Sequence, residues 1–186
     1  MTRWQAWDAR LRQPGPWHTR FDRPDGSKEV TWGRLSPRDG LGDHKLADLI
    51  YLAGDVVRAH RDATVVLTEG ERAADAVRDA GYLAAGTVCG ASSTPGAAVL
   101  GLLQDRHLVL WPDRDVVGAA HMGRIAGDLE GLGVRSLRYV DWPEAPEHGD
   151  AVDADPETIG RLIAGARLLP LVGPPLCARC GDAVAA

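Results

Sequence analysis

The chain has 186 residues, of which 45% are hydrophobic and 25% are charged, and its formal net charge is −5. This length and composition suit one compact domain with an attached segment, and they exclude wholesale disorder, a fibrous protein and a long repeat array. The chain has no run of 18 apolar residues and no signal-peptide pattern at its N-terminus, so we expect a cytoplasmic protein without membrane association.

Positive charge comes almost entirely from arginine. Lys28 and Lys45 are the two lysines among 21 basic residues, so the lysine of a nucleotide-binding G-x-x-x-x-G-K loop has no candidate position. Residues 1–60 contain 10 basic and 8 acidic side chains, whereas residues 61–170 contain 10 and 17. The acidic part argues against nonspecific nucleic-acid binding through net charge, although bound divalent metal would remove part of this negative charge.

Residues 1–60 form a segment that contains four of the six tryptophans. The run from Trp17 to Trp32 predicts two short strands joined by a tight turn at residues 24–27, because the Asp-Gly pair there accepts the positive φ angles of a hairpin. Apolar residues at helical spacing predict a helix over residues 45–59. Trp17 and Arg20 are candidates for binding single-stranded nucleic acid, since aromatic rings beside positive charge stack on bases.

From residue 63 onward, short apolar runs alternate with helical segments. Strands are predicted at 63–68, 82–88, 107–111 and 135–140, and helices at 71–80, 95–104, 117–132 and 155–167. This alternation is typical of an α/β fold in which an open, mostly parallel four-stranded sheet is flanked by helices. Functional sites in such folds lie outside the carboxyl ends of the strands.

Acidic residues follow three of these four strands. They are Glu69 after the first strand, Asp113 and Asp115 after the third, and Asp150 and Asp153 after the fourth. Carboxylate oxygens are the ligands that Mg²⁺ prefers in proteins, so these five side chains are candidate ligands of a divalent ion. Acids at such positions also serve as helix caps or solvated loop residues, and that alternative stays open.

Three ordered motifs resemble those of the TOPRIM domain, and most closely its primase-like group in phage and plasmid replication proteins. The motifs are VVLTEGERAADAV, VLWPDRDVVGAAH and VDWPEAPEHGDAVDAD, and the resemblance covers roughly residues 60–167. It implies a Rossmann-like TOPRIM domain over residues 61–168, preceded by the tryptophan-rich segment 1–60 with its hairpin and helix. Residues 169–186 would then form a proline-containing tail.

The resemblance also implies roles for individual residues. Glu69, Asp113 and Asp115 match the catalytic acids, and these three with Asp150 and Asp153 match the metal ligands. The implied function is primase-like nucleotidyl or phosphoryl transfer in DNA replication with Mg²⁺ or Mn²⁺, since metal-bound carboxylates neutralise charge on the transferred phosphate. Single-stranded DNA and nucleotides are the expected partners, and a primase-helicase, with its replicative helicase, is the candidate context.

Three more residues are candidate nucleic-acid contacts beside Trp17 and Arg20. They are Arg72 and Arg114, which flank the acids, and His121, which is expected on the surface of the helix after the third strand. Ordinary surface positions without a ligand are the alternative for each of them.

Other functions stay open at the same centre. A metal-dependent nuclease similar to OLD proteins, or a non-catalytic module that binds nucleic acid or replisome proteins, would use the same acids. The Asp-x-Asp-x-Val run also fits haloacid dehalogenase phosphatases, but those enzymes use a downstream lysine that the chain lacks. A topoisomerase is disfavoured because Tyr51, Tyr82 and Tyr139 all lie in apolar runs that are typical of a core.

The C-terminal tail contains Cys177 and Cys180, which have the spacing of half a zinc site. A closed site needs four ligands, and the tail holds no second pair. One alternative is a zinc site completed by another chain, or by Cys89 and a histidine. The other two are one half of a zinc ribbon and an unligated tail. We favour the last two and expect no complete Zn²⁺ site.

Overall fold

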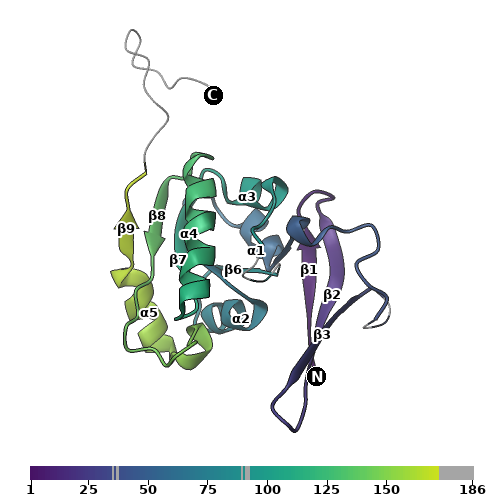
Figure 1. The fold of residues 1–186 in the computed structure, drawn as a ribbon. Coiled ribbons are helices and arrows are strands. Elements are labelled where there is room, and N and C mark those ends of the chain that lie inside the picture. Colours follow the sequence, from purple (N-terminus) through teal and green to yellow (C-terminus); the bar gives the residue numbers. More distant parts are fainter. Residues whose placement is uncertain (35, 37, 89, 91–92, 172–186) are drawn as a thin grey trace.

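The computed structural model describes residues 1–34, 36, 38–88, 90 and 93–171 (Figure 1). Within these residues, nine strands form one mixed sheet in the order β3-β2-β1-β4-β6-β5-β7-β8-β9. The strands are β1 Thr2–Asp8, β2 Gln13–Asp22, β3 Lys28–Gly33, β4 Leu49–Tyr51, β5 Thr64–Thr68, β6 Ala84–Thr87, β7 His107–Trp111, β8 Ser136–Tyr139 and β9 Arg167–Leu169. The helices are η1 Leu46–Asp48, α1 Ala53–Arg58, α2 Glu71–Asp79, α3 Ala97–Leu103, α4 Val116–Glu130, η2 Ala151–Asp153 and α5 Pro156–Gly165.

The four predicted parallel strands are present at the centre of this sheet. β6, β5, β7 and β8 lie side by side, and every pair among these neighbours is parallel. The expected four-stranded sheet is nevertheless wrong, because antiparallel strands extend it at both ends. β4 pairs with β6 on one side and β9 pairs with β8 on the other. The last helix was predicted to extend to residue 167, but it stops at Gly165, and Arg167 begins β9.

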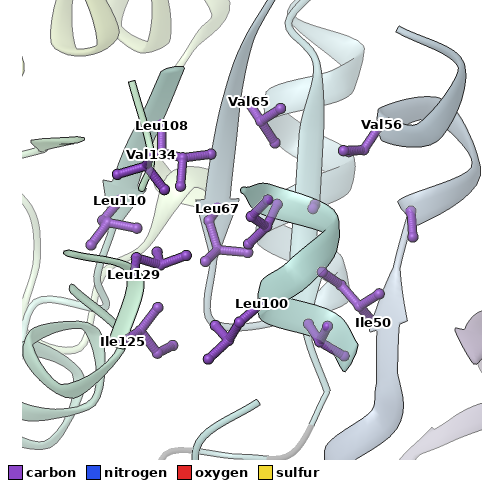
Figure 2. Close-up of a cluster of buried hydrophobic side chains, with 14 of the residues drawn as sticks. Ile50, Val56, Val65, Leu67, Leu100, Leu108, Leu110, Ile125, Leu129 and Val134 are labelled. Atoms are coloured by element: carbon purple, nitrogen blue, oxygen red, sulfur yellow. The ribbon is translucent and has the colours of Figure 1, made fainter. Parts of the chain in front are cut away.

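Helices cover both faces of the parallel strands. On one face Val65 and Leu67 of β5 pack with α1, α3 and α4, and Figure 2 shows this cluster around Leu67, Leu100 and Ile125. On the other face Val66 packs with α2 and α5. Neighbouring strand residues point to opposite faces, so a strand that is buried on both sides needs the continuous apolar run that the sequence shows.

The hairpin predicted between Trp17 and Trp32 is present as β2 and β3. Its turn contains Gly26 at φ 82° and the Asp25 carboxylate, which accepts a hydrogen bond from the Ser27 N–H at 2.9 Å. β1 pairs with β2 and was not predicted, although Trp4, Ala6 and Asp8 are buried in strict alternation. Figure 1 shows these three strands at one side of the molecule and β8 and β9 at the other.

The predicted single helix over residues 45–59 is wrong. The segment forms η1, β4 and α1, and Leu52 separates the last two with a left-handed backbone at φ 60°. Leu49 and Ile50 are each 1% exposed and belong to different clusters, which places them on opposite faces of the sheet. A strand between β1 and β6 buries both residues, whereas a surface helix would bury one stripe of side chains.

No helix in the described part of the chain is long and apolar enough to span a bilayer.

Candidate active site

The fold brings the first two predicted acids to one edge of the sheet. β5 and β7 are adjacent and parallel, and Thr68 and Trp111 pair at their carboxyl ends. Glu69 follows the first strand and Asp113 the second, so the two side chains lie at the same edge. The Asp113 N–H donates a hydrogen bond of 3.1 Å to Glu69 Oε1, which connects the two strand ends directly.

The electrostatics of these acids reflect burial and mutual repulsion. Burial and the negative charge of Asp113 raise the pKa of Glu69 from its ordinary value of 4.5 to about 7. Burial and the charges of Asp150 and Asp115 raise the pKa of Asp113 from 3.8 to about 6, while Lys28 and His148 act in the opposite direction. The acids are therefore close enough to disfavour each other's ionisation, and a cation beside them would remove this penalty.

Two glycines allow the backbone to approach these acids. A Cβ atom on Gly118 would lie 2.6 Å from Glu69 Oε1 and 2.7 Å from the Asp113 carbonyl oxygen, which is too close for either atom. A Cβ atom on Gly86 would lie 2.7 Å from the Gly70 carbonyl oxygen. The first turn of α4 and strand β6 can thus press against the loops that carry the acids.

Asp115 is the N-cap of α4 and also contacts His148. Its Oδ1 accepts a hydrogen bond of 2.6 Å from the Gly118 N–H, and its Oδ2 lies 2.8 Å from His148 Nδ1. The Gly118 hydrogen bond, followed by the one with His148, lowers the pKa of Asp115, and the same pair raises the pKa of His148. His148 was not predicted from the sequence; its place one residue before the Gly149–Asp150 step was the available signal.

Asp150 and Asp153 form a capping box at η2. The Val152 N–H donates to Asp150 Oδ1 at 2.6 Å, and the Asp150 N–H donates to Asp153 Oδ2 at 3.0 Å. Burial raises the pKa of Asp150, which lines the same cavity as Glu69 and Asp113. Asp115, Asp150 and Asp153 therefore do cap helices, as the sequence analysis allowed. Metal binding by these three acids stays a prediction.

A cavity of about 420 Å³ joins the acids to the N-terminal strands. Glu69, Asp113 and Asp150 line it from the parallel strand ends, and Arg72 lines it from α2. The opposite wall comes from one face of β1–β3 and consists of Trp4, His18, Arg20, Lys28, Val30 and Trp32. An acidic wall and a cationic, aromatic wall thus enclose one space.

Contacts within the wall from β1–β3, and between this wall and α2, hold the cavity in place. His18 stacks on Trp32, with 4.4 Å between ring centroids and 12° between ring planes, and its Nδ1 lies 2.5 Å from Glu71 Oε1. The Trp4 indole N–H donates to the Asp75 carboxylate at 2.7 Å. Both acceptors belong to α2, so this helix positions the N-terminal strands relative to the acids.

The predicted nucleic-acid contacts occupy different places. Arg20 and Arg72 line the 420 Å³ cavity, but Trp17 lies on the opposite face of β2 from Arg20, because side chains alternate along a strand. Arg114 lines a second cavity of about 450 Å³, which also contains Trp111 and Trp142. Lys28 was not predicted, and the alternation of the hairpin was the signal that groups it with Trp32.

The expected surface position of His121 is wrong. The side chain is 1% exposed, its Nε2 lies 3.5 Å from Thr87 Oγ1, and burial lowers its pKa. α4 turns this residue towards the sheet together with Met122 and Ile125, so it cannot contact a nucleic acid at the surface.

No three of the described histidine, cysteine, aspartate and glutamate side chains form a group arranged to hold a metal ion. The carboxylate chemistry and the mutual repulsion of Glu69, Asp113 and Asp150 suit Mg²⁺ or Mn²⁺, and the metal stays a prediction. Cys89, Cys177 and Cys180 lie outside the described residues.

The sequence matches no family model and no curated protein. Solved structures with a similar fold include primases. The Aquifex aeolicus primase (zinc-binding and RNA polymerase domains) has a TM-score of 0.64 at 18% identity, over 88% of this chain and 39% of that chain. The E. coli primase catalytic core has a TM-score of 0.62 at 16% identity, over 89% of this chain and 52% of that chain.

A third similar structure contains bacteriophage T7 lagging-strand DNA polymerase interacting with primase domains of two gp4 subunits bound to an RNA/DNA hybrid and dTTP. The matched chain has a TM-score of 0.53 at 14% identity, over 90% of this chain and 78% of that chain. The chain therefore has the fold of primase catalytic cores, and it spans about half or less of the two bacterial primase chains.

Proposed function

We propose that this chain is a primase-like nucleotidyltransferase core of the TOPRIM type, which joins nucleotides on single-stranded DNA with Mg²⁺ or Mn²⁺. The observation that carries the proposal is the 420 Å³ cavity, in which Glu69, Asp113 and Asp150 face Lys28 and Arg20. The fold shared with primase cores and the three TOPRIM-like motifs give further support.

The acidic wall suits the reacting phosphate. Glu69, Asp113 and Asp150 would hold the divalent ion, which supplies charge neutralisation at the transferred phosphate when it is bound. The pKa of about 7 for Glu69 belongs to the metal-free protein; a bound cation would favour the ionised form, and that carboxylate could accept a proton from an attacking hydroxyl. In nucleotidyl transfer that hydroxyl attacks the α-phosphate and pyrophosphate leaves, so a base and a site for negative charge are both required.

The opposite wall suits the polyanionic nucleotide and template. Lys28 and Arg20 supply positive charge on neighbouring strands, and Lys28 is near enough to counteract the raised pKa of Asp113. Trp4 and the stacked His18–Trp32 pair supply flat surfaces beside these charges. Positive charge next to aromatic rings is how proteins hold single strands without sequence preference.

The chain spans 39% of the Aquifex primase chain and 52% of the E. coli core. The remaining parts of those primase chains have no counterpart among the matched residues. A helicase partner and a zinc module are therefore part of the proposal. We propose that the chain is part of a replication protein of the phage or plasmid primase-helicase type. The three TOPRIM-like motifs are the only support for this finer assignment.

One assay separates primer synthesis from the nuclease and binding alternatives. The protein is incubated with Mg²⁺ or Mn²⁺, ribonucleotides and labelled single-stranded DNA, and products are resolved on a denaturing gel beside a mobility-shift gel. We expect extension products. Cleavage fragments would replace the proposal by a nuclease, and a mobility shift without either product would indicate a binding module.

Paired variants test the acids themselves. Asp113→Asn together with Asp115→Asn should abolish extension, because the variant loses two of the negative charges that act on Glu69. Asp128→Asn, at an exposed position of α4, is the matched control and should retain full activity. Extension by the double variant at the wild-type rate would refute the assigned site.

A further inference from the structure

The second cavity, of about 450 Å³, lies at the carboxyl ends of β7 and β8 beside the first turns of α4. We call it the Trp142 cavity. The proposed reaction uses only Asp113 and Asp115 of its lining, so its apolar walls have no role in that reaction. These walls consist of Trp111, Val116, Ala119, Tyr139, Val140, Trp142, Pro143 and Ala145.

The walls expose apolar surface that the protein itself does not cover. Trp111 and Trp142 meet edge to face, with 6.4 Å between ring centroids and 90° between ring planes. Val116 lines the cavity from α4 and is 85% exposed, and its neighbour Val117 is 60% exposed. A concave apolar site with exposed aliphatic side chains at its edge is typical of a surface that binds a ligand or a partner.

Backbone contacts hold the cavity in this shape. The Arg114 N–H donates to the Gly149 carbonyl at 2.8 Å, and the His148 N–H donates to the Arg114 carbonyl at 3.2 Å. A Cβ atom on Gly149 would lie 2.8 Å from atoms of Pro146, so this packing requires glycine. The loops after β7 and β8 are thus fixed to each other, and a ligand would not have to order them.

Negative charge predominates around the cavity. Asp113, Asp115 and Asp141 line it with Arg114, and the exposed Glu144 and Glu147 follow on the same loop as Asp141. Neither Asp141 nor Glu144 has an ion-pair partner among the residues that the structure describes.

Three cationic groups lie near these five carboxylates. Arg114 lines the cavity, and the Arg167 guanidinium lies 6.0 Å from the centroid of the Tyr139 ring. The third is His148, whose Nδ1 is already in contact with Asp115 at 2.8 Å. Carboxylates therefore stay in excess even when His148 is protonated, and the phosphates of a nucleic acid would meet like charge here.

We propose that the Trp142 cavity docks a basic segment of a partner protein. One large apolar or aromatic side chain of that segment enters the cavity, and flanking lysine or arginine side chains meet Asp141, Glu144 and Glu147. This choice of partner follows from the charge of the loop, since a cationic segment is complementary to it. The proposal does not rest on the proposed function, although the docked segment would contact the loop that carries Asp113 and Asp115.

Fluorescence anisotropy with labelled five-residue peptides tests the proposal on the full chain in EDTA. The probe has the sequence KRWRK, and the comparison peptides are KRGRK and EEWEE. We expect KRWRK to bind about tenfold more tightly than KRGRK, because tryptophan fills the cavity, and EEWEE not to bind. Equal affinities for KRWRK and KRGRK would show that charge alone is recognised and would overturn the proposal, as would binding of EEWEE.

A matched pair on α4 tests the cavity itself. Ala119→Leu puts a larger side chain into the cavity from an exposed position and should weaken KRWRK binding about tenfold. Ala120→Leu makes the same change at the next exposed position, which does not line the cavity, and should leave the affinity unchanged. Equal affinities in the two variants would overturn the proposal.

A second pair tests the acidic loop. Asp141→Asn with Glu144→Gln should weaken KRWRK binding about threefold and reduce its dependence on salt. Asp128→Asn with Glu157→Gln removes two exposed carboxylates of α4 and α5 and should change neither quantity. The same salt dependence in both double variants would overturn the role of the loop.

Binding by Asp113→Asn with Asp115→Asn separates this proposal from the catalytic one. The double variant should still bind KRWRK within about threefold of wild type, since the apolar walls and the acidic loop remain. Loss of peptide binding in this variant, with normal binding in Asp141→Asn with Glu144→Gln, would assign the peptide to the candidate catalytic acids and overturn the proposal.

Two further measurements with Ala119→Leu exclude other occupants of the cavity. The variant should bind labelled oligo(dT) and ATP as wild type does, and the two proteins should sediment alike in analytical ultracentrifugation. Weaker binding of oligo(dT) or ATP would make a nucleic acid or a nucleotide the occupant. A wild-type dimer that the variant cannot form would make a second copy of this chain the occupant, and either result would overturn the proposal.

Discussion

Glu69 is held in a setting that disfavours its charged form. It lies between the first turn of α4 and the end of β7, where burial and the charge of Asp113 raise its pKa to about 7. The cost is tolerated because Gly118 permits the close approach and the Asp113 N–H supplies one hydrogen bond. A side chain that costs stability in the metal-free protein is what a binding or catalytic site requires, since a ligand then offsets that cost.

The difference in stability between the wild-type protein and the Glu69→Gln variant, both free of metal, should depend on pH. A carboxyl whose pKa is raised on folding binds its proton more tightly in the folded state, so wild-type stability falls as pH rises from about 4.5 to about 7. Glutamine keeps the acceptor and removes the titration, so the variant should match wild type near pH 4 and exceed it by about 2 kcal/mol at pH 8. Urea denaturation in EDTA measures both values. A difference that stays constant between pH 4 and pH 8 would contradict the assigned pKa.

Gly118→Ala should damage the site and the fold together. The new methyl would lie 2.7 Å from a backbone oxygen that cannot move independently, so we expect a loss of about 1–3 kcal/mol in unfolding free energy and loss of primer synthesis. Gly123→Ala lies on the same helix with open space around the new methyl, and it should be neutral or stabilising. Equal melting temperatures for the two variants would contradict the close packing at Gly118.

α2 connects the N-terminal strands to the parallel strands. Its Asp75 accepts hydrogen bonds from the Trp4 indole at 2.7 Å and the Tyr51 hydroxyl at 2.8 Å, and it pairs with Arg78 at 2.7 Å. Burial and the Asp75 carboxylate raise the pKa of Tyr51 to about 12. One helix residue thus gathers groups from β1, β4 and its own next turn, and it determines how the cationic wall meets the acids.

Asp75→Ala should therefore cost about 2 kcal/mol, because the Trp4 indole is 5% exposed and would keep a buried, unpaired N–H. Asp79→Ala removes a carboxylate that bonds Arg78 from an exposed position of the same helix, and the change should stay within about 0.5 kcal/mol. Thermal or urea denaturation compares the two. Similar losses for both would show that Asp75 does not connect these elements.

At the scale of the whole molecule, an acidic α/β core and a more basic N-terminal sheet share one continuous sheet. The connection is the antiparallel pair β4–β6, in which Ile50 faces Thr87 and Tyr51 faces Gly86. This pairing places the cationic wall beside the ends of β5 and β7. The more basic N-terminal segment and the acidic residues after the parallel strands therefore line opposite walls of one cavity.

Mg²⁺ should stabilise the wild-type protein and not the acid-depleted one. A ligand that binds the folded state alone raises the unfolding free energy, and at concentrations well above its dissociation constant we expect the melting temperature to rise by roughly 5 °C. Asp113→Asn with Asp115→Asn should lose this rise, as followed by differential scanning fluorimetry with Mg²⁺ and with Mn²⁺. A rise of the same size in the double variant would place the ion elsewhere.

The order of elements and the positions of the acids could be predicted from local patterns. Continuous apolar runs identified β5–β8, and residues after parallel strands necessarily gather at one edge of the sheet, which is why Glu69 and Asp113 meet. The helix predicted over 45–59 failed because apolar spacing in a short run fits a helix and a doubly buried strand alike. The predicted surface position of His121 was wrong for a related reason. A histidine is usually exposed on a helix, and its residue type does not show that it lies on the buried face.

The sequence by itself determined the parallel core, the hairpin and the set of acids, because these depend on contacts between residues near in the chain or on the shared direction of strands. Tertiary structure decided which side of the hairpin meets the acids: Lys28 and Arg20 face them, and Trp17 lies on the opposite face of β2. Alternation groups side chains by face, but the choice of face follows from long-range pairing between β4 and β6 and from the contacts of α2, which no local pattern encodes.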